Sequence, residues 1–579
     1  MFKKFWWFIS YYKNKYTLAI IFLLLSNVVG LIPPYITGRL TDMIFEGSIA
    51  LNTFLIILGL DLLIIIIKYF FAMGWAYFTF RAGNEIDYKT RDNLMNKFLG
   101  QSLKFFETNS TGSLMGKSTN DVDSISNFAG IGTLSLFDST VFPLIIIIMM
   151  MVVVDVKLTL AAILPLPILA YLSIWIGDKI LVRWDKVQRA FDKLNTSVLE
   201  DVEGIRITRV FNLQESRRKK FEESGQNLLD RNMDVVKYQA LLTPVQRIIP
   251  AFTFIIGIGY GSILISKGEI SIGQLISFTY YLNMLVWPMH AFGNFINLKQ
   301  QANASMERVQ EVLDYEEDTM DSHGAVDIST NPDIEFIKHS FRYPSSTEDV
   351  LKDISVKIEK GKSLGIIGKT GSGKSTFIKQ LLHLYPMETN SIKINGNNID
   401  EYSISSIRER IGYVPQKHMI FSKTIRDNIR LSRPDASDEE VMRAIRLADF
   451  EKDLKIFPKG LDTLSGERGI SLSGGQKQRI GIARGFLKEP DILVLDDAMS
   501  AVDGSTEKNI INNIKKSRQG KTMIISSHRI SQIKDLDEII VLDEGEIVER
   551  GSHDELIEKG KWYAKQYENQ SARSQFDEE

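Results

Sequence analysis

Long apolar runs dominate the first half of the chain, whereas the second half alternates short apolar strands with polar turns. Six runs are long enough to cross a membrane, because about 20 apolar residues span its hydrocarbon core. They cover residues 17–37, 51–80, 129–154, 158–177, 248–266 and 272–298. Buried helices of a large soluble protein are the alternative, but PLIIIIMMMVVV followed by LTLAAILPLPILAYLSIWIG exceeds what a soluble core needs. The pattern predicts a six-helix membrane domain.

Basic residues predict the orientation of these helices. The short loops after the first, third and fifth runs carry only Arg39, Lys157 and Lys267, whereas the loops at 81–128 and 178–247 are rich in Lys and Arg. Cytoplasmic loops carry this excess, so both long loops and both termini are expected in the cytoplasm. The start, MFKKFWWFISYYKNKY, lacks a small-residue cleavage site after its apolar run and is expected to stay as an interfacial segment.

The two long loops have a helical, amphipathic pattern. If residues 179–247 form a helical hairpin, each arm of about 30 residues is roughly 45 Å long. The turns at the tips are expected at 113–125 (SLMGKSTNDVDSI) and 202–212 (VEGIRITRVFN). Mechanical levers and merely solvated hairpins both fit this pattern, and spacing alone does not separate them.

Composition narrows the functional classes. The 579 residues contain 69 Lys and Arg against 71 Asp and Glu, so no basic excess indicates a nucleic-acid partner. With no cysteine, the chain has no disulfide, thiolate metal site or Cys nucleophile. A polar, acidic stretch near residues 316–333 separates the apolar first half from a second half whose composition is that of a soluble enzyme. We expect a membrane domain at 1–318, a linker at 319–332, a nucleotide-binding domain at 333–570 and a tail at 571–579.

The segment SLGIIGKTGSGKSTFIKQLLHLY predicts a strand, a glycine-rich turn and a helix that bind phosphate. Backbone N–H groups of the turn would face the phosphates, and the helix N-terminus would add its positive dipole end. The lysine would reach the β- and γ-phosphates and the serine hydroxyl after it would bind Mg²⁺. The predicted ATP-binding residues of this loop are Gly368, Lys369, Thr370, Gly371, Ser372, Gly373, Lys374, Ser375 and Thr376.

Two further motifs belong with this loop. DILVLDD is an apolar strand that ends in Asp496, a position suited to a carboxylate associated with Mg²⁺. SLSGGQKQRI at 471–480 sets two glycines after a serine at the start of a helix, which makes a second anion-binding nest. Two nests with one lysine-bearing loop suggest that the second nest serves a different nucleotide.

With these motifs in order, the whole chain resembles the ATP-binding-cassette family, and six spans before one cassette resemble its exporter half-transporters. The resemblance implies a membrane all-α six-helix domain with long cytoplasmic helical extensions, fused to an α/β P-loop ATPase. It implies that Tyr343 stacks on adenine, that Gln416 senses Mg²⁺, and that His528 holds the γ-phosphate. GERG at 466–469 precedes the signature as in exporters, and the loop tips would be coupling helices. The signature matches Ser471, Leu472, Ser473, Gly474, Gly475 and Gln476, and the D-loop matches Ser500, Ala501 and Asp503.

In this family two cassettes meet head to tail, so the signature of one chain completes the ATP site of the other. The family usually has a glutamate as catalytic base where this chain has Asp497. The shorter side chain is typical of the degenerate-site subunit of heterodimeric bacterial multidrug exporters, whose partner is a dissimilar half-transporter. The resemblance therefore implies ATP-driven export of amphipathic small molecules across the bacterial cytoplasmic membrane. A working Asp497 base, a homodimeric lipid flippase and a non-pumping ATP-gated or regulatory subunit are the alternatives.

Few ionisable residues interrupt the apolar runs: Asp61, Lys68, Asp138 and His290. Such residues suggest function by default. However, Asp61 and Lys68 are seven apart and could form a structural pair, and Asp138 is expected near a helix end. Aromatic residues of the sixth run suit either a cavity for amphipathic cations or ordinary packing, so the sequence names no substrate. These are Tyr280, Tyr281, Trp287, Phe292 and Phe295.

Overall fold

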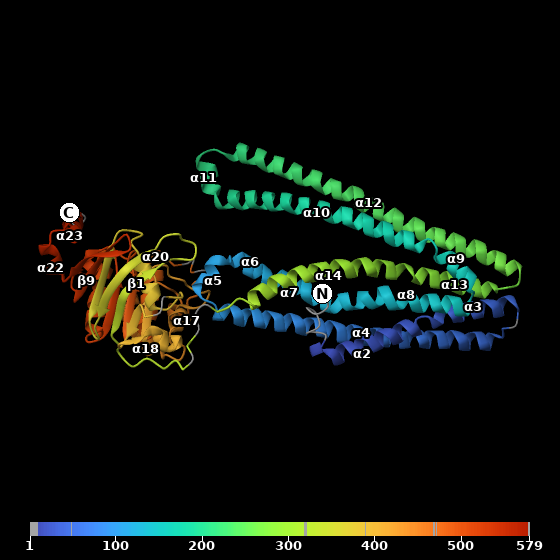
Figure 1. The fold of residues 1–579 in the computed structure, drawn as a ribbon, viewed down its shortest axis with the longest axis horizontal. Coiled ribbons are helices and arrows are strands. Elements are labelled where there is room, and N and C mark those ends of the chain that lie inside the picture. Colours follow the sequence, from blue (N-terminus) through green and yellow to red (C-terminus); the bar gives the residue numbers. More distant parts are fainter. Residues whose placement is uncertain are drawn as a thin grey trace. The chain divides into compact units, whose positions relative to one another are not determined.

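The computed structural model describes residues 10–47, 49–317, 321–322, 324–387, 390–466, 469 and 472–576. The chain forms two compact units (Figure 1). The first comprises Met1–Lys97 and Gly112–Asp314, and the second comprises Phe98–Thr111 and Tyr315–Glu579. A short piece of the first long loop thus belongs to the second unit, which the sequence did not predict. The domain boundaries drawn from the sequence stay predictions.

Helices make up the regular secondary structure in the described residues of the first unit. Its segments are α2 (Lys13–Val29), α3 (Ile32–Phe45), α4 (Leu51–Gly100), α6 (Thr111–Gly116), α7 (Val122–Asn127), α8 (Thr133–Val153), α9 (Val156–Ile163), α10 (Leu166–Glu203), α11 (Ile205–Val210), α12 (Gln214–Ser266), α13 (Ile272–Met284) and α14 (Val286–Leu313). Two π-helical turns, Lys117–Asp121 and Phe128–Gly132, connect α6, α7 and α8. The last residues of α4, from Phe98 on, belong to the second unit.

Five helical runs in the described part of the chain are long and apolar enough to cross a membrane: Lys13–Phe45, Leu51–Gly100, Thr111–Val153, Val156–Glu203 and Gln214–Ser266. The last, with 53 residues, is about 80 Å long, far more than the roughly 30 Å of hydrocarbon. The sixth predicted run is not one helix. It divides at Leu285 into α13 and α14, because Pro288 has no N–H for the Met284 carbonyl and its ring crowds that carbonyl.

The first predicted tip, 113–125, is wrong. These residues are helical, and the turn lies earlier, where α4 ends at Gly100 and α5 (Leu103–Thr108) begins. The polar cluster does not break the helix because its hydroxyls bond to carbonyls of their own helix. Ser118 donates to Leu114 over 3.0 Å and Thr119 donates to Met115 over 2.8 Å.

The second predicted tip, 202–212, is confirmed. Helix α10 ends at Glu203, the short helix α11 (Ile205–Val210) follows, and α12 starts at Gln214 (Figure 1). The long arms α10 and α12 run side by side and pack against each other. The predicted helical hairpin is therefore present.

The second unit contains two sheets. A four-stranded antiparallel sheet has the order β2-β1-β4-β5, and a six-stranded sheet has the order β10-β9-β3-β8-β7-β6. Strands β9, β3, β8, β7 and β6 are parallel, and β10 is antiparallel to β9. The strands are β1 (Ile334–Phe341), β2 (Leu351–Ile358), β3 (Ser363–Gly368), β4 (Ile392–Ile394), β5 (Asn397–Asn398), β6 (Ile411–Val414), β7 (Ile492–Asp496), β8 (Thr522–Ser526), β9 (Glu538–Asp543) and β10 (Glu546–Gly551).

Helices cover these sheets and bury the apolar side chains of the central parallel strands, which form two cores. β7 and β8 are buried along their full length, as expected for strands covered on both faces. The helices are α15 (Lys374–Leu381), α16 (Ile404–Arg410), α17 (Ile425–Arg430), α18 (Asp438–Leu447), α19 (Glu451–Leu454), α20 (Gly474–Leu487), α21 (Gly504–Ser517), α22 (His553–Glu558) and α23 (Trp562–Phe576).

Candidate functional site

The turn between β3 and α15 is shaped to receive an anion. Gly371 and Gly373 adopt left-handed φ values of 85° and 101°, which side chains rarely allow. A Cβ atom on Gly368 would lie 2.1 Å from the Leu542 carbonyl, so only glycine fits there. The Ser372 hydroxyl is buried and has no hydrogen-bond partner among the described atoms. Left-handed glycines and an orphaned hydroxyl fit a turn whose polar groups bind a ligand.

Lys374 begins α15 and folds back over this turn. Its ammonium donates to the carbonyls of Gly368 and Lys369, each over 2.9 Å. The side chain is buried, and burial lowers the pKa of the ammonium below its usual value. A desolvated cation held at the rim of an anion-binding turn is placed to bind a phosphate.

Asp496 ends β7 beside the same helix. It is 2% exposed, and its Oδ1 accepts a hydrogen bond from the Ser375 hydroxyl over 3.0 Å. Burial raises the pKa of this carboxyl, which a bound cation would reverse. Hydroxyl and carboxylate oxygens are ligands that Mg²⁺ prefers, and the ion usually completes its shell with water and phosphate oxygens. Accordingly, the described residues include no cluster of three or more His, Asp or Glu that would hold a metal alone.

Asp497 follows in a left-handed conformation with φ 47°. Its N–H donates to the Ser526 carbonyl over 2.8 Å, and its Oδ2 accepts from the Gln416 amide over 3.2 Å. His528 lies within electrostatic reach of Lys374 and of both aspartates, and its pKa is lowered, first by burial and then by the lysine charge. The parallel strands β3, β7 and β8 thus bring these predicted residues to one edge of the sheet.

Tyr343, which follows β1, lies against the start of α15. Its hydroxyl lies 3.0 Å from the Thr376 hydroxyl, and the Lys379 ammonium is 5.4 Å from its ring centre. The Tyr385 ring meets the Tyr343 ring edge-on at 5.3 Å. An aromatic ring beside a phosphate-binding helix is positioned to stack on a nucleotide base.

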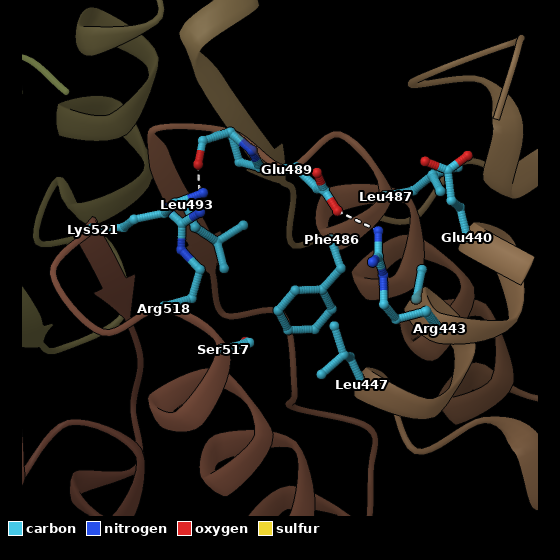
Figure 2. Close-up of a pocket in the computed structure, with 12 residues that line it drawn as sticks. Glu440, Arg443, Leu447, Phe486, Leu487, Glu489, Leu493, Ser517, Arg518 and Lys521 are labelled. Atoms are coloured by element: carbon cyan, nitrogen blue, oxygen red, sulfur yellow. Dashed lines mark hydrogen bonds and ion pairs between the residues drawn. The ribbon is translucent and has the colours of Figure 1, made fainter. Parts of the chain in front are cut away.

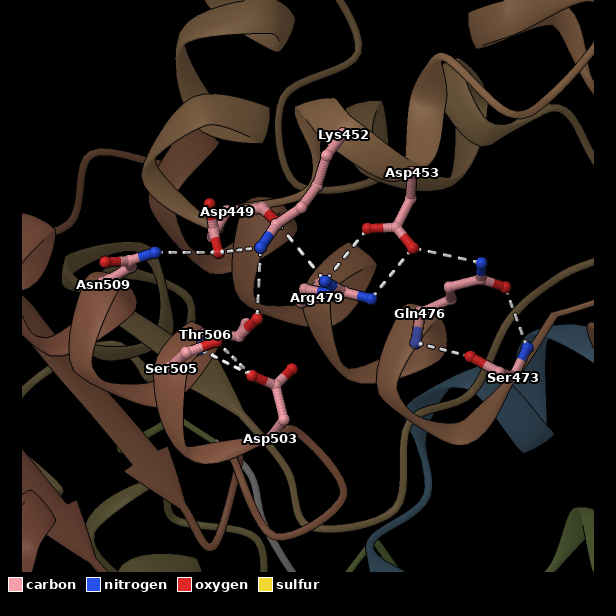
Figure 3. Close-up of polar contacts among 10 residues, drawn as sticks. All are labelled: Asp449, Lys452, Asp453, Ser473, Gln476, Arg479, Asp503, Ser505, Thr506 and Asn509. Atoms are coloured by element: carbon pink, nitrogen blue, oxygen red, sulfur yellow. Dashed lines mark hydrogen bonds and ion pairs between the residues drawn. The ribbon is translucent and has the colours of Figure 1, made fainter. Parts of the chain in front are cut away.

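The second nest opens α20 (Figure 3). Ser473 caps the helix: its hydroxyl accepts from the Gln476 N–H over 3.3 Å, and its own N–H donates to the Gln476 side chain over 3.0 Å. Gly474 and Gly475 follow, and a Cβ on Gly475 would lie 3.0 Å from the Ala501 carbonyl. Leu472 is buried beneath the nest, whereas Ser471 lies outside the described residues, as do Glu467 and Arg468 of GERG.

A buried carboxylate that the sequence did not single out supports this nest. Asp453 of α19 accepts from the Gln476 amide over 3.2 Å and forms an ion pair with Arg479 over 3.0 Å (Figure 3). Both side chains of the ion pair are 11% exposed. Lys452, its neighbour, pairs with Asp449 over 3.0 Å. No motif marks Asp453, whereas Arg479 could have been noticed as a cation on the signature helix.

The predicted D-loop packs against the same helix. The Gln478 side chain accepts from the Ala501 N–H over 2.8 Å and donates to the Ser500 hydroxyl over 2.9 Å. Asp503 caps α21 by accepting from Thr506 N–H over 2.9 Å, and hydrogen bonds from Ser505 and Thr506 lower the pKa of its carboxyl (Figure 3). Hydrogen bonds from Gln478 of α20 therefore join the predicted D-loop to the helix that carries the predicted signature.

A cavity of 310 Å³ lies apart from these residues, between α18, the end of α20 and the end of α21 (Figure 2). Arg443 pairs with Glu489 at one side, and Arg518 donates to the Pro490 and Asp491 carbonyls at the other. None of the predicted nucleotide-binding residues lines it. The charged groups of Glu440, Arg443, Glu489 and Arg518 are bound by other groups of the protein.

The intramembrane residues are only partly brought together. Asp138 lies inside the helical run Thr111–Val153, not near its end, and accepts a hydrogen bond from the Trp287 indole over 3.3 Å. No ion pair joins Asp61 to Lys68 in the part of the chain that is described, and the buried Oδ1 of Asp61 has no hydrogen-bond partner there. The His290 side chain lies outside the described residues.

Comparisons with known proteins agree with this architecture. The family model for the ABC transporter transmembrane region matches residues 16–289, and the ABC transporter model matches residues 351–500. The chain is 42% identical to the probable multidrug resistance ABC transporter ATP-binding/permease protein YheI of Bacillus subtilis, over 98% of this chain and 97% of the relative. It is 32% identical to the multidrug resistance-like ATP-binding protein MdlA of Escherichia coli, over 99% and 97%.

A solved structure of a bacterial Atm1-family ABC exporter with ATP bound matches with a TM-score of 0.81 at 25% identity, and covers 96% of this chain and 98% of that one. The predicted fold class is therefore confirmed: a helical transmembrane domain fused to an α/β nucleotide-binding domain with mixed sheets. Both halves and almost the full length match the same family. The chain belongs to the ABC transporter family, as a multi-pass membrane exporter that binds ATP and couples its hydrolysis to transport.

Proposed function

We propose that this chain is one half of a heterodimeric multidrug exporter, with an inefficient ATP site at its own Asp497. The partner is a dissimilar half-transporter of the same family. The substrates are hydrophobic or amphipathic small molecules, a proposal supported by the multidrug names of YheI and MdlA. The protein lies in the bacterial cytoplasmic membrane, with its nucleotide-binding domain and both termini in the cytoplasm.

The phosphate loop, 368–376, would bind the ATP of this chain. Lys374, which already folds over the turn, would bind the β- and γ-phosphates, and Tyr343 would stack on adenine. Mg²⁺ would be held by Ser375 and Gln416, with Asp496 acting through water. His528, whose pKa is lowered first by burial and then by the Lys374 charge, would hold the γ-phosphate.

The signature would serve the ATP of the partner. The two nests occupy different helices, and no hydrogen bond in the described part of the chain joins Ser473 to the residues of the phosphate loop. The start of α20 is nevertheless held in place by the hydrogen bonds among Ser473, Gln476 and Asp453. The signature sequence lies on a different helix from the phosphate loop of this chain, which supports assembly with a second cassette whose ATP it would contact.

An exposed apolar surface on the long hairpin also supports the need for a partner. At the tip of the long hairpin, Ile207, Val210 and Phe211 are 61%, 78% and 69% exposed. Three large apolar side chains on one short helix would be covered by a complementary surface in a stable assembly. We assign the nucleotide-binding domain of the partner chain as that surface.

Asp497 is the observation on which the heterodimer proposal rests. Relative to a glutamate, its carboxylate ends about one bond length earlier, roughly 1.5 Å, and such a displacement of a water-positioning group can cost about a hundredfold in rate. The Gln416 amide also engages this carboxylate. Efficient turnover would therefore depend on the second site, built from the partner's catalytic glutamate and this chain's Ser473.

The test is ATPase and drug transport by the purified chain alone and by the chain co-expressed with a half-transporter that carries glutamate at the matching position. We expect robust, drug-stimulated ATPase only from the mixed pair. Full activity of the chain alone would contradict the heterodimer and favour a homodimer. Ion currents that do not require hydrolysis would contradict export altogether.

Two substitutions in the mixed pair separate the roles of the nests. Ser473→Arg should nearly abolish turnover, because it blocks the nest that completes the partner's site. Lys374→Ala should mainly weaken nucleotide binding at the inefficient site and leave most turnover. Equal and complete loss from both would indicate two equivalent sites.

A further inference from the structure

A carboxylate lies deep within the membrane-spanning part of the first unit. Asp138 stands 15 residues before the end of α8 at Val153, a distance of about 22 Å along the helix. A hydrocarbon core is about 30 Å thick, so Asp138 lies inside it, towards the end from which the long helical extensions project. Charged side chains at such depth are rare and mark sites of function.

Two polar groups from other helices meet Asp138. The Trp287 indole N–H donates to Asp138 Oδ2 over 3.3 Å, and the polar side chain of Asn27 lies close to the carboxylate. Trp287 is the second residue of α14 and stands 15 residues after Ile272, where α13 begins. Asn27 belongs to α2 and stands 18 residues before Phe45, the end of the helical run Lys13–Phe45. At about 1.5 Å per residue, all three groups lie about 22–27 Å along the chain from the short-loop ends of their runs. Helices α8 and α14 pack against each other and run side by side in Figure 1.

Among the described side chains, none supplies a cation that pairs with Asp138. The carboxylate forms no ion pair with Lys, Arg or His there, and its neighbours Trp287 and Asn27 are neutral. The His290 side chain lies outside the described residues. Lys68, the basic residue in the apolar run 51–80, lies beside Gly30, where a Cβ atom would be 3.3 Å from its ammonium nitrogen. A buried or half-buried charge is normally paired, so this carboxylate is suited to a positive group that comes from outside the chain.

The surroundings favour an organic cation over a metal ion. A metal would need several oxygen ligands, whereas Asp138 is the single carboxylate of the cluster. Trp287 is 60% exposed, so its indole offers an open aromatic surface beside the charge. Aromatic faces attract delocalised or alkylated cations and bind their apolar parts. The two chemistries together match a lipophilic cation.

We propose that Asp138 and Trp287 form an intramembrane anchor for lipophilic organic cations, with Asn27 orienting the carboxylate. This rests on the proposed export function, since it names a substrate class for that function. The cation would pair with the carboxylate, stack on the indole and enter from the cytoplasmic side of the membrane. Uncharged drugs of similar shape would gain no benefit from Asp138.

The test is equilibrium binding of two probes to the mixed pair in lipid nanodiscs without ATP. The probes are tetraphenylphosphonium, a lipophilic cation, and triphenylphosphine oxide, an uncharged molecule of similar shape. Asp138→Asn keeps the size of the side chain and one acceptor oxygen for the Trp287 indole but removes the charge. We expect it to weaken tetraphenylphosphonium binding roughly tenfold or more and to leave triphenylphosphine oxide unaffected.

Further variants make the result specific. Asp138→Glu should retain most of the cation affinity, and Trp287→Ala should weaken it about fivefold through loss of the aromatic face. Thr140→Val is the matched control, because the Thr140 hydroxyl is exposed and bonds only to the Leu136 carbonyl of its own helix. It should change neither affinity.

Equal weakening of both probes by Asp138→Asn would show a structural role and overturn the proposal. No binding of tetraphenylphosphonium by the unmodified pair, or binding that ignores Asp138, would also overturn it. ATP-dependent transport in proteoliposomes is scored separately. Asp138-dependent binding without transport would support the site and contradict export. Transport of the cation with Asp138-independent affinity would support export and contradict the site.

Discussion

The Tyr385 hydroxyl donates a hydrogen bond to the Glu107 carboxylate. Glu107 belongs to α5, the short helix at the turn of the first long loop, and Tyr385 follows the phosphate-binding helix α15. The Leu103 N–H also donates to the Leu384 carbonyl over 3.4 Å, and Phe105 is buried against Tyr315. Since the Tyr385 ring meets Tyr343, a contact chain runs from the loop to the proposed adenine site.

Tyr385→Phe should reduce the coupling of transport to ATP hydrolysis. The substitution removes the hydroxyl but keeps the ring that packs on Tyr343, so ATP affinity should hold. A hydrogen bond to a charged group contributes about 1.5–3 kcal/mol, so its loss should weaken the contact between α5 and Tyr385. We expect fewer substrate molecules moved per ATP in proteoliposomes.

The matched control is Tyr402→Phe, a buried tyrosine of the same unit whose hydroxyl donates to the Ile394 carbonyl. It should not alter the transport ratio. Glu107→Ala combined with Tyr385→Phe should be no worse than either change alone, because both remove the same hydrogen bond. Additive losses would contradict a direct link.

Asp453→Ala should destabilise the second unit strongly. It leaves the buried Arg479 guanidinium without its carboxylate, and an uncompensated buried charge costs about 3–5 kcal/mol. Thermal unfolding of the mixed pair at fixed protein concentration would detect this loss. Asp453→Ala with Arg479→Leu should recover most of the stability, because a buried ion pair replaced by apolar groups is often neutral.

Stability and function should separate in that double variant. Without Asp453 the Gln476 amide loses an acceptor, so the capped start of α20 should be less rigid even in a stable protein. ATPase should therefore remain low although the unfolding temperature recovers. Full recovery of ATPase would show that Asp453 matters only for stability.

His528 should titrate below the usual histidine value of 6.5, because burial and the nearby Lys374 charge both disfavour its protonated form. Histidine NMR of the nucleotide-free pair measures this, and the resonance lost in His528→Gln assigns the signal. As the pH falls below 6.5 the unfolded chain takes up this proton first, so protonation destabilises the fold. Lys374→Met should move the titration back towards 6.5, and an unshifted value in the unmodified protein would contradict the geometry.

The phosphate loop could be predicted because its chemistry is local. Gly371 and Gly373 adopt the left-handed conformations that a tight anion-binding turn demands, and the following helix is set by sequence neighbours. The same loop pattern indicated Ser375, and the apolar strand that ends in Asp496 indicated the carboxylate. The structure places the Ser375 hydroxyl 3.0 Å from Asp496 Oδ1. Each residue was predicted from a short local pattern.

Contacts between distant segments could not be predicted in the same way. Asp453 lies 26 residues before Arg479 in a helix without a motif, so nothing in the pattern indicated their pairing. The first loop tip was misplaced because polar residues at 117–124 suggested a turn, whereas Asp121 is bound by Arg308 and Ser305 of α14. Long-range partners decided these cases.

Asp497→Glu should activate the ATP site of this chain. The Asp497 backbone is fixed by its hydrogen bond to Ser526, so a longer side chain would extend the carboxylate by about 1.5 Å towards the attacking water. The measurement needs a mixed pair whose partner has lost its own catalytic glutamate, so that any hydrolysis comes from this site. We expect steady-state ATPase to rise about tenfold, less than the full hundredfold, if the partner's signature is altered. Asp535→Glu is the control, because it lengthens an exposed carboxylate that pairs with Lys515. No gain despite normal ATP binding would place the defect in the partner's signature, and high hydrolysis with Asp497 unchanged would show that aspartate is a competent base.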